Sequence, residues 1–330
     1  DDGRTVIVIG LVDSCLIPRD MFDDAKARAQ RATGIPPERM LIAATHTHSA
    51  PAVMGVHGTD PHPEYREFVT GKIAEAIQQA YANRRPAQVG WGADACTEFV
   101  FCRRWIMKPG TAFTVPFTGR GENQAQMNPG HQNPNLVRQT GPVDPAVTVL
   151  SVRTPEGKPL ALLANYSTHY AGAPNISADY FGVFARRIGE LIGADPAAVP
   201  FVGIMSNGTS GDANCIDFSQ PPRDFDRFTV AEAVAQAALR AYQKIEHQAW
   251  VPLSMEETRL ELGVRKATEK EREAAKEFLE KNVKDRPVRN WEENYAREAV
   301  LVDQMPDRVE IILQAIGIGD LGIAAIPCET

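Results

Sequence analysis

The chain has 330 residues, 43% of them hydrophobic and 23% charged, and its 35 basic and 42 acidic residues give a net charge of −7. These values are ordinary for a globular protein of one large domain or two smaller ones. The sequence has no basic stripe of the kind that binds nucleic acid. No apolar run approaches the roughly 20 residues that span a bilayer. The five cysteines form no CxxC pair, so they predict neither a cysteine zinc site nor a dense disulfide framework.

The first third of the chain has a strand–helix–strand pattern. Residues 5–11 and 40–45 are apolar runs that predict strands, and residues 18–32 between them predict a helix that begins at a proline. This order favours parallel pairing of the two strands. Residues 63–83 predict an amphipathic helix. Its expected apolar face consists of Phe68, Ile73, Ala76, Ile77 and Ala80.

The rest of the chain mixes short strands, helices and one long irregular segment. Residues 107–142 are rich in Gly, Pro, Asn and Gln, and predict a long loop of the kind that is usually functional or mobile. The other expected elements are strands at 88–91 and 97–101, a hairpin of 147–153 with 160–166, helices at 179–192 and 227–245, a strand at 199–205, a charge-rich helical section at 268–299, and strands at 309–318 and 321–326.

The stretch His46-Thr47-His48 directly follows the apolar run 40–44. In an extended segment, side chains repeat on one face every two residues, so the two imidazoles leave the strand together. Two neutral imidazoles that converge make half of a site for a divalent metal such as zinc. The alternative is a pair of polar loop histidines at the end of a strand.

Polar residues follow three other predicted strands. His169 comes after the strand at 160–166, the loop 206–212 follows the strand at 199–205, and Glu329 follows the last strand. In α/β folds, ligand sites gather at the carboxyl ends of strands. Two histidines and a glutamate with an open position form a catalytic zinc set. Separate local roles for these residues remain the alternative, because they lie far apart in the sequence.

Residues 44–51, Ala-Thr-His-Thr-His-Ser-Ala-Pro, resemble the ATHTHSGPGG signature of the neutral/alkaline ceramidase family. Further segments resemble that family's motifs in the same order: residues 101–104, 141–144, 165–169, 176–179, 206–212 and 325–330. We therefore expect an α/β fold, a mixed sandwich-like catalytic domain with strand–helix units. It would span residues 1–330 as a single domain that is truncated at both ends, with a metal site at the carboxyl ends of its strands.

The resemblance implies roles for individual residues. His46, His169 and Glu329 would be ligands of Zn²⁺, while His48 and Arg103 would hold the substrate's amide oxygen and the developing oxyanion. The neighbouring Arg104 leaves the choice of arginine open. The further candidates for substrate binding or for support of the ligands are Asp13, Asp179, Ser210, Asp212 and Asn214; the first two are equally plausible as strand or helix caps. The family resemblance also suggests an extracellular or periplasmic protein.

One departure from the family affects the mechanism. The family has a serine in its GDxSPN motif, whereas Asn214 stands at that place here. An amide cannot act as a hydroxyl nucleophile, so a mechanism through that serine is not available. Ser206 and Ser210 are better explained by turn or helix-entry roles. A zinc-bound hydroxide could instead attack an amide carbonyl directly.

Four functional hypotheses follow from these patterns. The leading one is a ceramidase-like, zinc-dependent hydrolase of linear amides, with an N-acyl lipid or another small molecule as substrate. In it, hydroxide on zinc attacks the carbonyl, and His48 and Arg103 stabilise the oxyanion. The alternatives are a metal hydrolase of the same fold with a different ester or amide substrate, a non-catalytic binding module, and an amidohydrolase barrel. The predicted hairpin and the lone His169 argue against the barrel.

Overall fold

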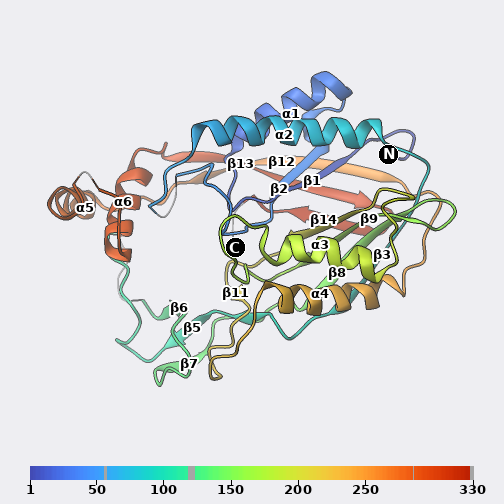
Figure 1. Ribbon diagram of the computed structural model, residues 1–330. Coiled ribbons are helices and arrows are strands. Elements are labelled where there is room, and N and C mark those ends of the chain that lie inside the picture. Colours follow the sequence, from blue (N-terminus) through green and yellow to red (C-terminus); the bar gives the residue numbers. More distant parts are fainter. Residues whose placement is uncertain (56–57, 118–122, 285, 328–330) are drawn as a thin grey trace.

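The computed structural model describes residues 1–55, 58–117, 123–284 and 286–327, and these form four layers (Figure 1). Two β-sheet layers pack face to face, helices α1 and α2 cover the outside of one, and helices α3 and α4 cover the outside of the other. The predicted mixed α/β, sandwich-like fold is confirmed. Among the described helices, none combines the length and the apolar character needed to cross a membrane.

The predicted parallel strand–helix–strand unit is present near the N-terminus. Strand β1 (Val8–Val12) pairs in parallel with β2 (Met40–Ala44), and α1 (Arg19–Thr33) connects them with the short 3₁₀ helix Pro37–Arg39. Helix α1 ends at Gly34, whose φ of 75° is the left-handed conformation that glycine adopts readily. Helix α2 (Pro63–Ala82) packs alongside α1.

The expected inner face of α2 is only partly correct. Ile73 and Ile77 are buried, but Phe68 is 58% exposed, and Ala76 and Ala80 are also exposed. Val69 is buried in place of Phe68. The buried residues of α2 are Val69, Thr70, Ile73, Ala74 and Ile77, so its inner face is turned by about one residue from the expected one.

Three antiparallel strands belong to the same layer as β1 and β2. They are β12 (Leu253–Gly263), β13 (Arg308–Ile318) and β14 (Leu321–Ala325). The two C-terminal strands were predicted, but β12 was not, because its sequence alternates charged and apolar residues and stays largely exposed. Helices α5 (Glu269–Asn282) and α6 (Trp291–Asp303) connect β12 to β13 and project from one end of the molecule (Figure 1).

The second sheet has the strand order β10-β9-β8-β3. Strand β3 (Gln88–Ala95) and β8 (Ala146–Arg153) are antiparallel, and β8 forms the predicted hairpin with β9 (Pro159–Tyr166). Helix α3 (Asp179–Leu191) then leads to β10 (Val202–Asn207), which is parallel to β9. Helix α4 (Arg227–Tyr242) follows and packs beside α3, so the main core lies between this sheet and the two helices.

The segment 107–142 is not the structureless loop that its composition predicted. It contains β6 (Ala125–Met127) and β7 (Leu136–Gln139), which pair with the two edges of β5 (Arg104–Met107). Residues 118–122 lie outside the described part. The strand expected at 97–101 is reduced to β4 (Phe101–Cys102), which pairs with β11 (Ala213–Asn214). Both corrections depend on strand partners distant in sequence, which local composition does not reveal.

A pair of phenylalanines tests this assignment of the core. Phe184 on α3 is fully buried, whereas Phe68 on α2 is 58% exposed. We expect Phe184→Ala to lower the free energy of unfolding by about 3–5 kcal/mol, because it leaves a cavity in the main core. We expect Phe68→Ala to change it by less than about 0.5 kcal/mol. Urea unfolding followed by circular dichroism measures both, and equal losses would contradict the layer assignment.

Candidate metal centre

The candidate site lies where strands from both sheets reach their carboxyl ends. His46 and His48 follow β2, and His169 follows β9 in the other sheet. The ring centroid of His46 lies 4.8 Å from that of His48 and 4.6 Å from that of His169. The centroids of His48 and His169 are 5.2 Å apart. The structure therefore brings together three histidines that the sequence selected from two segments more than 120 residues apart.

His46 is held by the end of the neighbouring strand β1. Its backbone N–H donates to the carbonyl of Ser14 at 3.0 Å, and its ring atom Nδ1 lies 2.8 Å from the carbonyl oxygen of Cys15. A carbonyl oxygen only accepts hydrogen bonds, so Nδ1 carries the proton and Nε2 is the ring's acceptor or ligand atom. The residue adopts a positive φ of 69°, which turns the chain sharply at the end of β2.

His169 is oriented in the same way by a different loop. Its Nδ1 lies 3.2 Å from the carbonyl oxygen of Ser210, so the same reasoning assigns the proton to Nδ1 and leaves Nε2 as the ligand atom. The preceding Thr168 is completely buried, and its hydroxyl donates to the carbonyl of Phe99 at 2.7 Å. Metal-binding histidines typically donate their other ring N–H to a backbone carbonyl or carboxylate.

The ligand atoms of Cys15, His46 and His48 lie within 4.8 Å of one another. The Nε2 atoms of His46 and His48 are 3.2 Å apart, and Cys15 Sγ is 3.8 Å from His46 Nδ1. His46 and His169 are buried, whereas His48 is exposed. These side chains are of the kinds that bind metals. His46 and His169 form the buried side of the cluster, and His48 faces the solvent.

Cys15 was not predicted to be part of the site. The sequence analysis treated the cysteines as a scattered set without a metal pattern. The available signal was its position, because Cys15 lies three residues after β1 and the parallel pairing places the ends of β1 and β2 side by side. A single cysteine carries no spacing motif, so only the pairing of the strands reveals its proximity to His46.

Tyr170 is a second neighbour that the sequence did not reveal. Its ring stacks on His48 with a centroid distance of 3.9 Å and an interplanar angle of 23°. It also lies 5.2 Å from the ring of His169, measured between centroids. The stacking restricts the orientation of the exposed His48 ring, since the aromatic faces are held in contact.

The structure distinguishes between the two adjacent arginines. Arg103 is 9% exposed, and its Nε and Nη2 donate to the carbonyl oxygen of Gly211 at 3.1 and 2.8 Å. Its backbone N–H donates to the carbonyl of Asp212. Arg104 is exposed on β5. Arg103 is therefore the arginine held at the site, and its charge acts on His169.

The loop after β10 supports the site through its backbone. Ser210 is buried, its carbonyl faces His169, and its hydroxyl accepts a hydrogen bond from the Asn207 side chain at 2.9 Å. The carbonyl of Asp212 accepts from the Arg103 backbone. The side chain of Asn214 donates to Asn128 Oδ1 at 3.3 Å and accepts from the backbone of Ile216. These contacts position the loop around His169 and Arg103.

Asp179 and Asp13, two of the three candidate aspartates, accept hydrogen bonds from residues close to the histidines. Asp179 is 1% exposed, and its carboxylate accepts hydrogen bonds from the backbone of Ala171, Gly172 and Tyr180. It therefore anchors the loop that follows His169. Asp13 accepts a hydrogen bond from the Thr45 hydroxyl at 3.2 Å, and desolvation by the surrounding protein raises the pKa of its carboxyl. Glu329, the third expected metal ligand, lies outside the described residues.

The environment of His169 keeps its imidazole neutral. Burial is the largest cause that lowers the pKa of His169 from 6.5 to about 3, and the positive charge of Arg103 is the next. A neutral imidazole is the form that binds a metal. Protons therefore compete weakly for this ring over the physiological pH range.

Comparison with known proteins identifies the fold. The structure matches the neutral ceramidase from Pseudomonas aeruginosa with a TM-score of 0.60 and 15% sequence identity, over 95% of this chain and 53% of that one. It matches a structure described as ceramidase complexed with C2 with a TM-score of 0.62 and 14% identity, over 97% of this chain and 55% of that one. The resemblance to ceramidases is thus confirmed as a shared fold. The chain spans about half the length of these structures, and no family model or curated protein matches its sequence.

The lowered pKa of His169 predicts a pH-dependent stability. An unfolded histidine, with a pKa near 6.5, binds a proton that the folded His169 does not, so the folded state loses stability as the pH falls below about 6.5. With a chelator present, we expect this residue to account for a loss of about 2 kcal/mol between pH 7 and pH 5. The loss should be smaller by that amount in His169→Gln, measured by urea unfolding at both pH values.

His62 provides the control for this measurement. It is exposed at the start of α2, and we expect His62→Gln to retain the pH dependence of the wild type. A wild-type pH dependence in His169→Gln as well would contradict the assignment of a neutral, buried His169.

Proposed function

We propose that this protein is a zinc-dependent hydrolase of linear amide bonds, with an N-acyl lipid as its substrate class. The observation that carries the proposal is the convergence of His46, His48 and His169 at the ends of strands from two sheets. The shared fold with ceramidases supports it, since the two matched structures cover nearly all of this chain.

The donor set fits zinc. Two of the three imidazoles have their Nδ1 proton directed to a backbone carbonyl, which leaves Nε2 as the ligand atom. The Nε2 atoms of His46 and His48 are 3.2 Å apart, so the ring of His48 lies directly beside the ligand atom of His46. Imidazole nitrogens, with a thiol such as Cys15 nearby, are ligands that zinc accepts and that calcium and magnesium do not favour.

In this proposal His46 and His169 are the buried ligands, and Glu329 is the expected third. Zinc at such a site polarises a carbonyl oxygen and lowers the pKa of water. His48 is exposed beside the ligands, so it is placed to donate a hydrogen bond to the amide oxygen of a substrate. Its stacking on Tyr170 keeps the ring oriented for that task.

Arg103 supplies a positive charge that is already in position. Its guanidinium is fixed by the carbonyl of Gly211, and its side chain is largely buried. A preorganised cation near the reacting carbonyl stabilises negative charge that develops on the oxygen, without the cost of reorienting water. We assign the oxyanion role to His48 and Arg103 together.

Exposed apolar side chains on the loops around the histidines support an N-acyl lipid. Met54, in the loop after His48, is 40% exposed, and Ile176, in the loop after His169, is 77% exposed. Hydrogen bonds join these loops: the Ser49 hydroxyl donates to the carbonyl of Ala173, and the backbone of Ser177 donates to the carbonyl of Ser49. An acyl chain entering the site would contact these side chains and remove them from water.

The loop contacts of Asn214 support a mechanism without a hydroxyl nucleophile at this position. Its amide group is engaged with Asn128 and with the backbone of Ile216, which is a structural arrangement. The proposal therefore assigns no nucleophilic role to this loop. The proposal gives positioning roles, through the hydrogen bonds described above, to Asp179, Asp13, Ser210 and Asp212.

Metal content is the first test of the proposal. We expect the purified chain to bind about one zinc ion, and both His46→Ala and His169→Ala to lose it, because each removes an expected ligand atom. Elemental analysis after dialysis against zinc measures this. His131→Ala is the matched control, since that ring contacts the carbonyl of Gln220 and lies outside the cluster. Zinc that is absent, or retained in both variants, would favour a non-catalytic binding module.

The adjacent arginines test the catalytic role. We expect Arg103→Gln to lower kcat for hydrolysis of an N-acylated sphingoid base by about 10²–10³, because it removes the preorganised charge. Arg104→Gln should leave kcat within about twofold, since Arg104 is exposed on β5. Fatty-acid release measures both, and unfolding curves check that the variants remain folded. Zinc binding without turnover of N-acyl amides would favour a hydrolase of a different ester or amide.

A further inference from the structure

The segment that follows β1 brings a thiol to the histidine cluster. Cys15 lies three residues after β1, and its Sγ is 3.8 Å from Nδ1 of His46. One ligand atom each of Cys15, His46 and His48 lie within 4.8 Å of one another. These residues belong to two segments that the parallel pairing of β1 with β2 holds side by side. The structure therefore adds a sulfur to the imidazoles of the candidate metal centre.

The backbone around Cys15 is fixed by hydrogen bonds. The N–H of the buried Ser14 donates to the carbonyl of Val12 at 2.8 Å, and its carbonyl accepts from the backbone of His46. The carbonyl of Cys15 itself lies 2.8 Å from the His46 ring. A cysteine has a single rotatable bond that positions its sulfur. With the backbone held, rotation about this bond is therefore enough to move Sγ within the cluster.

The other described cysteines have different surroundings. Three of them are buried, namely Cys96, Cys102 and Cys215. The thiol of Cys102, for example, donates to the carbonyl of Arg104 at 3.2 Å. Cys15 is half-buried, so among the described cysteines it is the one that combines contact with the imidazoles and access from the solvent.

The charge of the site favours an anionic ligand. Imidazoles bind metals as neutral ligands, and the guanidinium of Arg103 adds a positive charge that acts on His169. A divalent ion bound among these groups would concentrate positive charge, which a thiolate offsets. A thiol that coordinates a metal loses its proton, and here the proton would pass to the solvent.

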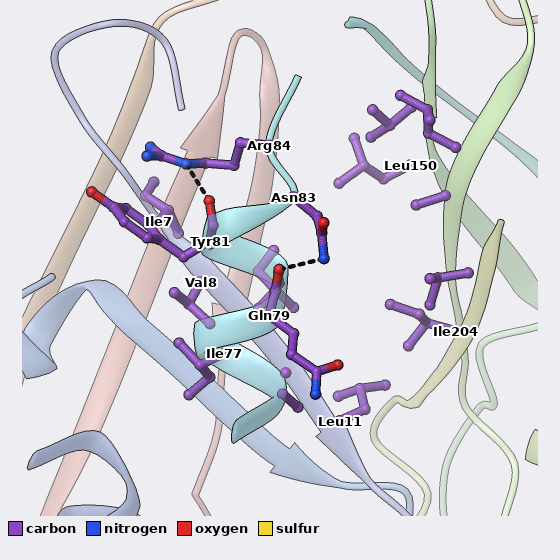
Figure 2. Close-up of a pocket in the computed structure, with 18 of the residues that line it drawn as sticks. Ile7, Val8, Leu11, Ile77, Gln79, Tyr81, Asn83, Arg84, Leu150 and Ile204 are labelled. Atoms are coloured by element: carbon purple, nitrogen blue, oxygen red, sulfur yellow. Dashed lines mark hydrogen bonds between the residues drawn. The ribbon is translucent and has the colours of Figure 1, made fainter. Parts of the chain in front are cut away.

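A cavity of about 1660 Å³ that borders β1 is a separate feature. Figure 2 shows it with Leu11 of β1 on one side and Ile204 of β10 on the other. Its lining extends to Asp13 and Thr45 and, within the part of the chain that the structure describes, does not include Cys15 or the three histidines. The cluster is therefore distinct from this largely apolar space.

We infer that Cys15 joins His46 as a thiolate ligand of the metal ion at this centre, with Sγ turned toward the ion at Nε2 of His46. The inference rests on the metal centre of the proposed function and adds the class of metal. Thiolate and imidazole together select zinc, cadmium or copper(I) over magnesium and manganese. Catalytic zinc sites that combine cysteine and histidine ligands with an open position occur in other proteins.

Cobalt(II) is the probe for the test, because it accepts the ligands that zinc accepts and its bond to a thiolate gives a charge-transfer band in the near ultraviolet. We expect the cobalt-loaded chain to show this band. In Cys15→Ser the band should be lost, while the visible d–d bands of bound cobalt remain. Serine keeps the backbone carbonyl that contacts the His46 ring. Circular dichroism checks that the variant is folded.

Cys328→Ser is the matched control. Cys328 precedes the expected ligand Glu329 in the sequence and lies outside the described residues, so its thiol is the alternative source of a sulfur ligand. We expect this variant to retain the charge-transfer band.

Alkylation by iodoacetamide provides a second readout. With free cobalt at ten times its Kd, we expect the alkylation of Cys15 to be slowed by about tenfold relative to the metal-free chain, because a coordinated thiolate does not react. Mass spectrometry of peptides measures the modification of each cysteine. In His46→Ala, the same cobalt concentration should no longer protect Cys15.

The outcomes separate this inference from the proposed function. Bound cobalt without the charge-transfer band or the protection would overturn the inference and leave the hydrolase proposal standing. A band that is retained in Cys15→Ser and lost in Cys328→Ser would also overturn it. A band that depends on Cys15, in a protein whose zinc form does not hydrolyse N-acyl amides, would support the inference and contradict the proposed activity. Absence of cobalt binding would overturn both.

Discussion

The parallel pairing of β1 with β2 is the constraint on which the site depends. It aligns Val12 with Ala44, so the segments that leave the two strands stay side by side. The backbone of Thr45 and of His46 continues the pairing through hydrogen bonds to Val12 and Ser14. The carbonyl of Cys15 is thereby placed at the His46 ring, where it fixes both the ring's orientation and the nitrogen that carries the proton.

The second sheet completes the cluster from the other side of the sandwich. His169 follows β9 and is buried, and its ring contacts the loop after β10 through the carbonyl of Ser210. The same loop fixes the guanidinium of Arg103. Burial and the nearby cation together keep the pKa of His169 low. The environment that keeps the ring of His169 neutral therefore also lowers the stability of the fold at acid pH, because the unfolded chain accepts the proton more readily.

The hydrophobic pattern predicted most of the strands and helices. It failed where a strand forms only because it pairs with a segment distant in the sequence. The runs at β1, β2, β8 and β9 are apolar and buried or half-buried, so the sequence pattern identified them. Strand β12 is exposed and carries charges, so its residues lack that signal although β13 pairs with its whole length. The segment 107–142 contains strands that exist only because β5 lies between them. Phe68 is exposed because the buried face of α2 is centred on Val69, Ile73 and Ile77, and the periodicity of the helix did not distinguish between these two neighbouring faces.

The sequence by itself selected His46, His48 and His169 as candidate metal-binding residues. The alternation in His46-Thr47-His48 after a buried strand, and a histidine after another, are local patterns that follow from strand geometry. The tertiary structure placed His169 beside His46 and His48. It alone decided that Arg103 rather than Arg104 lies at the site, and that Cys15 and Tyr170 belong to its surroundings. The reason is that local periodicity sets the face on which a side chain lies, whereas the packing of two sheets sets which faces meet.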